Sequence, residues 1–243
     1  MSTTQVDSEV LARRPANRPL YTWGALAAVL LVFAGFARTF YLNAVLAHFP
    51  LTGLLVFHGL VMTAWFVLFF VQVRLVASRR SDIHRRVGVY GAVLAALVLI
   101  VGTTTAIVAA KAGHSPPGAP PALVFLVIPL GDMVLFAGLV GSALWVRRRP
   151  EFHKRLMLVA TLGILPAAIS RIPIDAFQAA GLPAFFGVAD LVILACIVAD
   201  TVRHRRLHPA FGWGFAFVVL TQVGRFLLAG TAQWMVVAKW LTS

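Results

Sequence analysis

Five charged or titratable residues stand inside long apolar stretches of this chain, where such side chains are rare and often functional. They are His58, Asp132, Arg171, Asp190 and Arg225. The two arginines could bind a small anion or a carboxylate, the acids could balance their charge or carry protons, and the histidine could titrate near neutral pH. The sequence therefore predicts a ligand or proton site, with one alternative: ion pairs that only hold helices in register.

A basic phrase containing histidine recurs along the chain and provides a measure of depth. It occurs at 79–86, at 148–155 and, more loosely, at 203–208. Arg171 follows His153 by 18 residues, which is about 27 Å along a helix at 1.5 Å per residue. The phrase therefore predicts that the five side chains share one layer in the outer half of a membrane.

Charges in such a layer must be paired. Four of them facing lipid would cost on the order of 10 kcal/mol on the membrane-insertion scale. We expect Asp132 to pair with Arg171, and Asp190 to pair with Arg225, because each pair falls within one predicted helical hairpin. Helical spacing also places Gln222, Arg225, Ala229 and Gln233 on one face of the last helix.

Two histidines of the repeated phrase raise a second kind of chemistry. His84 and His153 hold equivalent positions in two hairpins and could meet at the cytoplasmic face to ligate a haem b or a metal. The alternative is two interfacial histidines whose basic neighbours bind lipid phosphates. A metal site is the weaker expectation, because no carboxylate or thiol supports these positions and the single cysteine, Cys196, lies in an apolar run.

Composition fixes the class of protein that must position these residues. Of 243 residues, 60% are hydrophobic and 12% are charged, which indicates a polytopic membrane protein. The net charge of +13 comes from short clusters at the ends of apolar segments, so it predicts membrane orientation and contact with anionic lipid headgroups rather than nucleic-acid binding.

The apolar segments predict an all-α transmembrane bundle of seven helices, with a polar, basic N-terminal tail at 1–20 and a membrane domain at 21–240. The helices are expected at 21–42, 51–77, 87–110, 121–146, 155–172, 184–202 and 211–238.

The first helix leads, and the other six form three related hairpins joined by the repeated phrase. Sixteen of the 21 Lys and Arg residues lie in the tail and in three connecting stretches. The positive-inside rule then predicts an inner-membrane protein with a cytoplasmic N-terminus and an external C-terminus. Pro129 and Pro166 are expected to kink the fourth and fifth helices.

One set of residues carries a resemblance to a known group of proteins. The run His58-Gly59, Trp65, Gln72, Arg79, His84-Arg85 and Gly88, with the later His153-Lys154-Arg155, resembles a family of uncharacterised bacterial integral membrane proteins of unknown function. The resemblance covers about residues 50–240 and implies no activity. A looser likeness to cytochrome b561-type bundles rests on the helix-2 histidine and the histidine-arginine pair, although the full set of core histidines is missing.

These observations favour a membrane protein that binds or transports a small polar ligand or protons over an enzyme. The alternatives are a haem- or quinone-linked redox protein and a non-catalytic structural protein. No phosphate-binding loop, nucleophile elbow or zinc-protease motif is present. A retinal protein would need a lysine in the middle of the last helix, where Arg225 stands instead.

Overall fold

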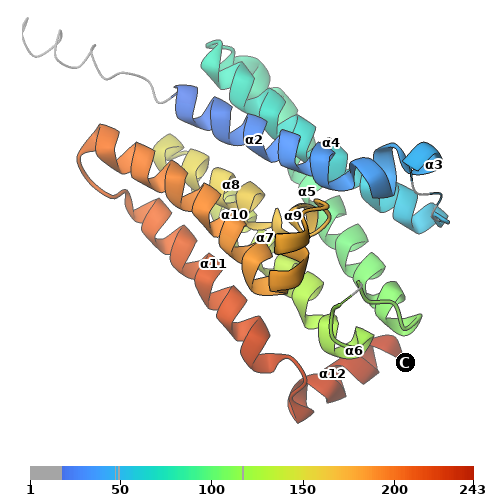
Figure 1. Ribbon diagram of the computed structural model, residues 1–243. Coiled ribbons are helices and arrows are strands. Elements are labelled where there is room, and N and C mark those ends of the chain that lie inside the picture. Colours follow the sequence, from blue (N-terminus) through green and yellow to red (C-terminus); the bar gives the residue numbers. More distant parts are fainter. Residues whose placement is uncertain (1–17, 47, 49, 117) are drawn as a thin grey trace, which may run out of the picture.

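The computed structural model describes residues 18–46, 48, 50–116 and 118–243. Within this part of the chain every regular element is a helix, and seven segments are long and apolar enough to cross a bilayer. They are Pro19–Tyr41, Gly53–Ala77, Ser81–Lys111, Ala122–Trp145, Pro150–Ile169, Gln178–His204 and Pro209–Leu228. The predicted all-α bundle with seven spans is confirmed (Figure 1).

Several spans consist of more than one helix. In chain order the elements are α2 (Arg18–Phe36), the π-helix η1 (Ala37–Tyr41), α3 (Asn43–Leu46), α4 (Gly53–Ala77), α5 (Ser81–Lys111), α6 (Ala122–Phe125), α7 (Val127–Trp145), α8 (Pro150–Gly163), α9 (Pro166–Ile169), α10 (Asp175–His204), α11 (Pro209–Leu228) and α12 (Ala232–Thr242).

Two prolines explain two of the interruptions. Pro129 has no N–H to donate to Phe125, and the helix breaks between α6 and α7 at Leu126. Pro166 likewise cannot donate to the Leu162 carbonyl, which instead accepts from the Leu165 N–H in a tightened turn between α8 and α9. The kinks expected at both prolines are confirmed.

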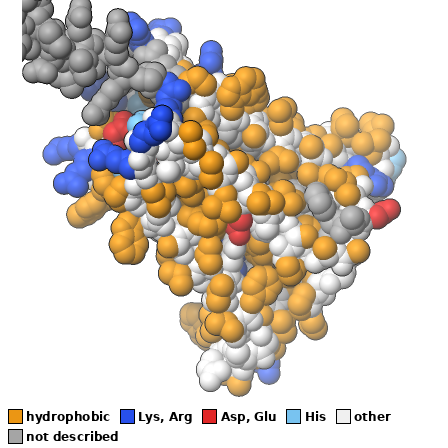
Figure 2. Space-filling model, turned by 60° about the vertical axis from the view of Figure 1, so that its left-hand side comes forward, with side chains coloured by type: hydrophobic (Ala, Val, Ile, Leu, Met, Phe, Trp, Pro, Cys, Tyr) orange, Lys and Arg blue, Asp and Glu red, His pale blue; other side chains and the backbone are white. Residues whose placement is uncertain are grey.

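The connections α4–α5, α7–α8 and α10–α11 lie at the same end of the bundle as the start of α2 (Figure 1). We call this end, with residues 78–80, 146–149 and 205–208, the basic end. Pro150 and Pro209 begin α8 and α11 at the first helical turn, where a missing N–H costs nothing. Figure 2 shows blue side chains gathered at this end and an apolar surface over most of the remaining body.

Helix α8 forms the centre of the bundle. It packs against α2, α7, α10 and α11, and it is the most buried of the seven spans. Two predicted hairpins, α4–α5 and α7–α8, are closely packed pairs. The third is not, because α11 packs mainly on α7 and α8 and only slightly on α10. The basic phrase therefore occurs three times, but only two of the three predicted hairpins are closely packed helix pairs.

The last predicted helix is too long. The expected span 211–238 ends at Leu228, where Gly230 takes a left-handed φ of 75° and Thr231 caps a new helix, α12. Helix α12 packs on α5 and α6 at the end opposite the basic end. Gln233 consequently lies on α12, and its predicted place on one helical face with Arg225 is wrong.

Candidate functional site

An ion pair between α7 and α11 lies in the interior of the bundle. Arg225 Nη1 donates to Asp132 Oδ1 at 2.6 Å, and both side chains are buried. Gly131 makes the approach possible, since a Cβ at this position would lie 2.3 Å from Arg225 Nε. The Arg225 guanidinium also lies 5.2 Å from the centre of the Phe186 ring. The predicted partner of Asp132, Arg171, was wrong.

Asp190 on α10 has a neutral partner. Gln222 Nε2 donates to Asp190 Oδ1 at 2.9 Å, and Gln222 lies nearly one helical turn before Arg225 on α11. The predicted pair of Asp190 with Arg225 is therefore wrong. Spacing predicted the side chains that reach this layer, but which helices face each other decides the partners.

The other two layer residues lie apart from this pair. Arg171, just beyond α9, donates to the Ala167 carbonyl and lies 4.6 Å from the centre of the Phe36 ring. His58 of α4 has an Nδ1 that is buried without a hydrogen-bond partner in the described part of the chain. The structure thus brings Asp132 together with Arg225 and leaves His58 and Arg171 outside this pair.

The Arg225 guanidinium uses only part of its hydrogen-bonding capacity. Only Nη1 has a hydrogen-bond acceptor, while Nε and Nη2 are buried and have none among the residues described. A buried N–H without a partner costs about 1 to 3 kcal/mol. Such atoms call for a water, an ion or a ligand group.

A second site lies at the basic end, where the structure brings His84 of α5 beside His153 of α8. Their ring centres are 6.4 Å apart and the ring planes are inclined by 70°. The predicted meeting of these two histidines is therefore present in the fold. Their rings come from two neighbouring hairpins, as the repeated phrase indicates.

Both rings are oriented by hydrogen bonds at Nδ1. His84 Nδ1 donates to Gln72 Oε1 at 2.9 Å, and the Gln72 amide donates in return to the His84 carbonyl at 3.3 Å. His153 Nδ1 donates to the Ala143 carbonyl at 2.8 Å. Each neutral ring therefore carries its proton on Nδ1 and a free lone pair on Nε2.

Sequence reasoning missed a third cluster, at the same end. Arg155 of α8 makes three hydrogen bonds of 2.7 to 2.9 Å to the two carboxylate oxygens of Asp200 on α10. Its Nη1 donates to Glu151 Oε2 at 2.6 Å. Arg155 and Asp200 are both fully buried. Arg155 had been counted with the surface charges of the phrase, and an acid inside an otherwise basic segment was the available signal.

None of these three sites has the composition of a closed metal centre. No group of three or more His, Cys, Asp or Glu side chains that could hold a metal ion occurs among the described residues. Comparison of the chain with protein-family models, with characterised proteins and with solved structures finds no match. The chain is an integral multi-pass membrane protein by its helices, and its sites must be interpreted from their own geometry.

Proposed function

We propose that this multi-pass membrane protein binds a b-type haem between His84 and His153 and serves as a membrane electron carrier. The single observation that supports the proposal is the 6.4 Å separation of the two imidazole centres. His84 and His153 would hold the haem iron through their Nε2 atoms, and the haem would supply one-electron transfer.

The number of ligands supports haem over a bare metal ion. A porphyrin supplies the four equatorial nitrogens, so the protein must supply only two axial ligands. The Nδ1 hydrogen bonds to Gln72 and to the Ala143 carbonyl hold the rings in place and increase their basicity. Arginines at the basic end, including Arg85 next to His84, are suitable partners for the haem propionates.

The test is the absorption spectrum of the full chain purified in mild detergent and supplied with haem. We expect an intense Soret band that is lost in His84→Ala and in His153→Ala, and retained in the control His114→Ala, whose histidine lies in the exposed loop after α5. Gln72→Ala should keep the band but lower the haem affinity. A protein that takes up no haem, or a band that survives both alanine variants, would overturn the proposal.

The layer around Arg225 supports a second function, the binding or transfer of a small anion or of protons. The observation in its favour is the pair of unpartnered nitrogens on Arg225, which are buried beside Asp132. Asp190 and its partner Gln222 would complete that site. His58 and Arg171 would lie on a separate path by which the ligand or protons reach it. Small carboxylates and phosphate should raise the melting temperature of the native protein, and Arg225→Gln should abolish the increase. An unchanged response would remove this function.

The charge distribution supports an orientation. The basic end would face the cytoplasm and its anionic headgroups, in the inner membrane of a bacterium, with α12 on the external side. The lone native cysteine, Cys196, is buried, so new cysteines report cleanly on the two sides. In intact cells we expect an impermeant thiol reagent to label Ser115→Cys and to spare Ser78→Cys. The reverse labelling would invert the orientation.

A further inference from the structure

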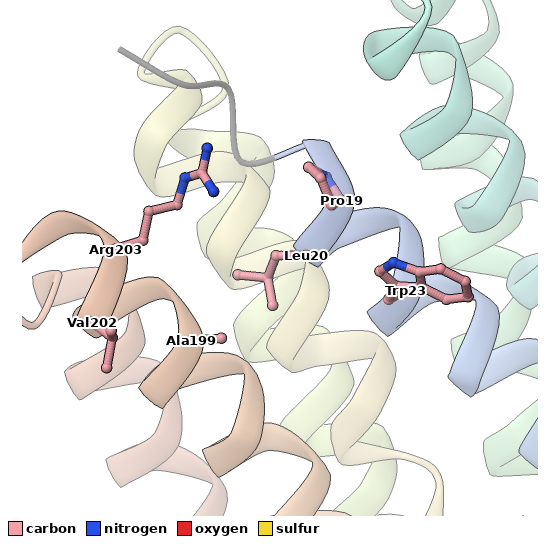
Figure 3. Close-up of a pocket in the computed structure, with 6 residues that line it drawn as sticks. All are labelled: Pro19, Leu20, Trp23, Ala199, Val202 and Arg203. Carbon is pink, nitrogen blue, oxygen red and sulfur yellow. The ribbon is translucent and has the colours of Figure 1, made fainter.

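A groove opens between α2 and α10 at the basic end. Its volume is about 650 Å³, and it is lined by Pro19, Leu20, Trp23, Ala199, Val202 and Arg203 (Figure 3). Five of these six side chains are apolar, and the sixth is an exposed arginine. The groove therefore combines an apolar wall with one positive charge at its rim.

The separation of the two helices produces this groove. Deeper in the bundle they lie close together, since a Cβ at Gly24 would lie 3.5 Å from Cys196 Sγ. Toward the basic end they diverge, and Figure 3 shows Leu20 and Ala199 on facing sides of the resulting space. Trp23 is exposed, as expected for an indole at the membrane interface.

The charges at this end favour an anionic occupant. The carboxylates of Glu151 and Asp200 at this end both accept hydrogen bonds from Arg155. Arg205 and Arg206 follow directly in the connection to α11. A basic rim over an apolar cleft between transmembrane helices is the arrangement that holds an acidic lipid.

We infer that the groove between α2 and α10 is a binding site for one anionic glycerophospholipid, with an acyl chain against Leu20, Ala199 and Val202 and its phosphate at Arg203. This inference rests on the proposed membrane orientation and is independent of the haem proposal. Arg203 has the long apolar stem needed to reach a phosphate at the interface from a helix end.

The experiment is native mass spectrometry of the full chain in mild detergent with added phosphatidylglycerol or phosphatidylcholine. We expect one tightly retained phosphatidylglycerol and weaker retention of phosphatidylcholine. Arg203→Gln should weaken phosphatidylglycerol binding roughly fivefold, the effect of one basic residue at an anionic surface. Ala199→Phe should also weaken it, by filling the groove while leaving every charge in place.

A matched control is Arg148→Gln, which removes an exposed arginine from the α7–α8 connection. This variant should retain the lipid. Equal losses in Arg203→Gln and Arg148→Gln would show diffuse attraction only and overturn the inference, as would equal retention of the two lipids. A photo-crosslinking side chain at Val202 should capture lipid, and capture of residues 1–17 instead would also overturn it. Loss of haem binding in another variant leaves these outcomes unaffected.

Discussion

Two buried arginine–aspartate pairs hold this bundle together, and they differ in how completely their hydrogen-bonding groups are used. At the basic end, Arg155 makes three hydrogen bonds to Asp200 and two more to Glu151. In the interior, Arg225 makes one hydrogen bond to Asp132 and leaves two nitrogens without partners among the residues that the structure describes. The two arginines are almost equally buried.

This difference distinguishes an ion pair that only stabilises the fold from one that can bind a ligand. A guanidinium with all its donors used has nothing left to offer a ligand, so Arg155 anchors α8 to α10. A buried guanidinium with unused N–H donors can bind a water, an ion or a ligand group, because a buried donor without a partner costs free energy. The same residue types can therefore serve two purposes, and the count of used donors distinguishes them.

The largest expected effect comes from breaking the pair of Arg155 and Asp200, in which every guanidinium donor is used. Asp200→Asn removes the only buried carboxylate that the structure shows bonded to Arg155 and leaves the guanidinium with the exposed Glu151 carboxylate, which should lower the free energy of unfolding by about 4 kcal/mol. Thermal unfolding of the purified protein in detergent measures this. Asp82→Asn, at an exposed position of the same end, is the control and should change stability little. Similar losses in both variants would contradict a structural role for Asp200.

The next largest effect comes from breaking the pair of Arg225 and Asp132, in which two guanidinium nitrogens are unused within the described part of the chain. Asp132→Asn should cost about 3 kcal/mol, less than the loss of Asp200, because a single hydrogen bond joins Asp132 to Arg225. A double-mutant cycle with Arg225→Gln gives the coupling energy of this pair, and a cycle of Asp200→Asn with Arg155→Gln gives that of the other. We expect the coupling to be larger for Arg155 with Asp200. The opposite order would remove the distinction between the two pairs.

A smaller effect moves Arg225 without changing its charge. Gly131→Ala places a methyl group 2.3 Å from Arg225 Nε, and this overpacking should cost about 1 to 2 kcal/mol. Gly141→Ala, on the same helix with nothing within 4 Å of the new methyl, should be neutral or slightly stabilising because alanine favours helices. Gly131→Ala should also weaken the proposed ligand binding at Arg225, and Gly141→Ala should leave it unchanged.

The smallest expected effect is a pH dependence of stability that comes from His208, near the Arg155 cluster. Burial lowers the pKa of His208 below its usual value, and the Arg155 charge lowers it further. His208 Nδ1 also accepts from the Ala210 N–H at the start of α11, which requires the neutral ring.

The sign follows from that lowered pKa. The unfolded chain binds a proton at His208 below about pH 6.5, before the folded protein does. This contribution to stability is therefore fully present above that pH and is lost as the pH falls toward the folded pKa. Melting temperatures of the native protein and of His208→Asn, which can still cap the helix, should differ more at pH 5 than at pH 8. Parallel pH profiles would contradict this assignment.

Length and hydropathy were enough to predict the seven spans, because a bilayer imposes about 20 apolar residues on any helix that crosses it. They could not predict the end of α11. The residues from 229 to 238 are still largely apolar, and a left-handed glycine followed by a capping threonine ends the helix there.

The partners within the candidate sites were only partly predictable. The repeated phrase correctly indicated that His84 and His153 could meet, because their two hairpins are packed alike. The same logic misassigned Asp190 and Arg225, since α11 presents Gln222 to α10 and Arg225 to α7. Arg155 escaped notice because a basic residue near a loop has the same sequence signature whether it points to water or to a buried acid.

The central position of α8 has a consequence for how the protein is made. This helix carries Glu151, Lys154 and Arg155 in its first two turns, and its buried partner Asp200 follows 45 residues after Arg155. Entry of α8 into the bilayer on its own would expose an arginine whose insertion is unfavourable. We therefore expect α8 to pack on α2 and α7 alone, and only loosely, until synthesis of α10 supplies the acid. Assembly of the bundle would then be completed late, when most of the chain has left the ribosome.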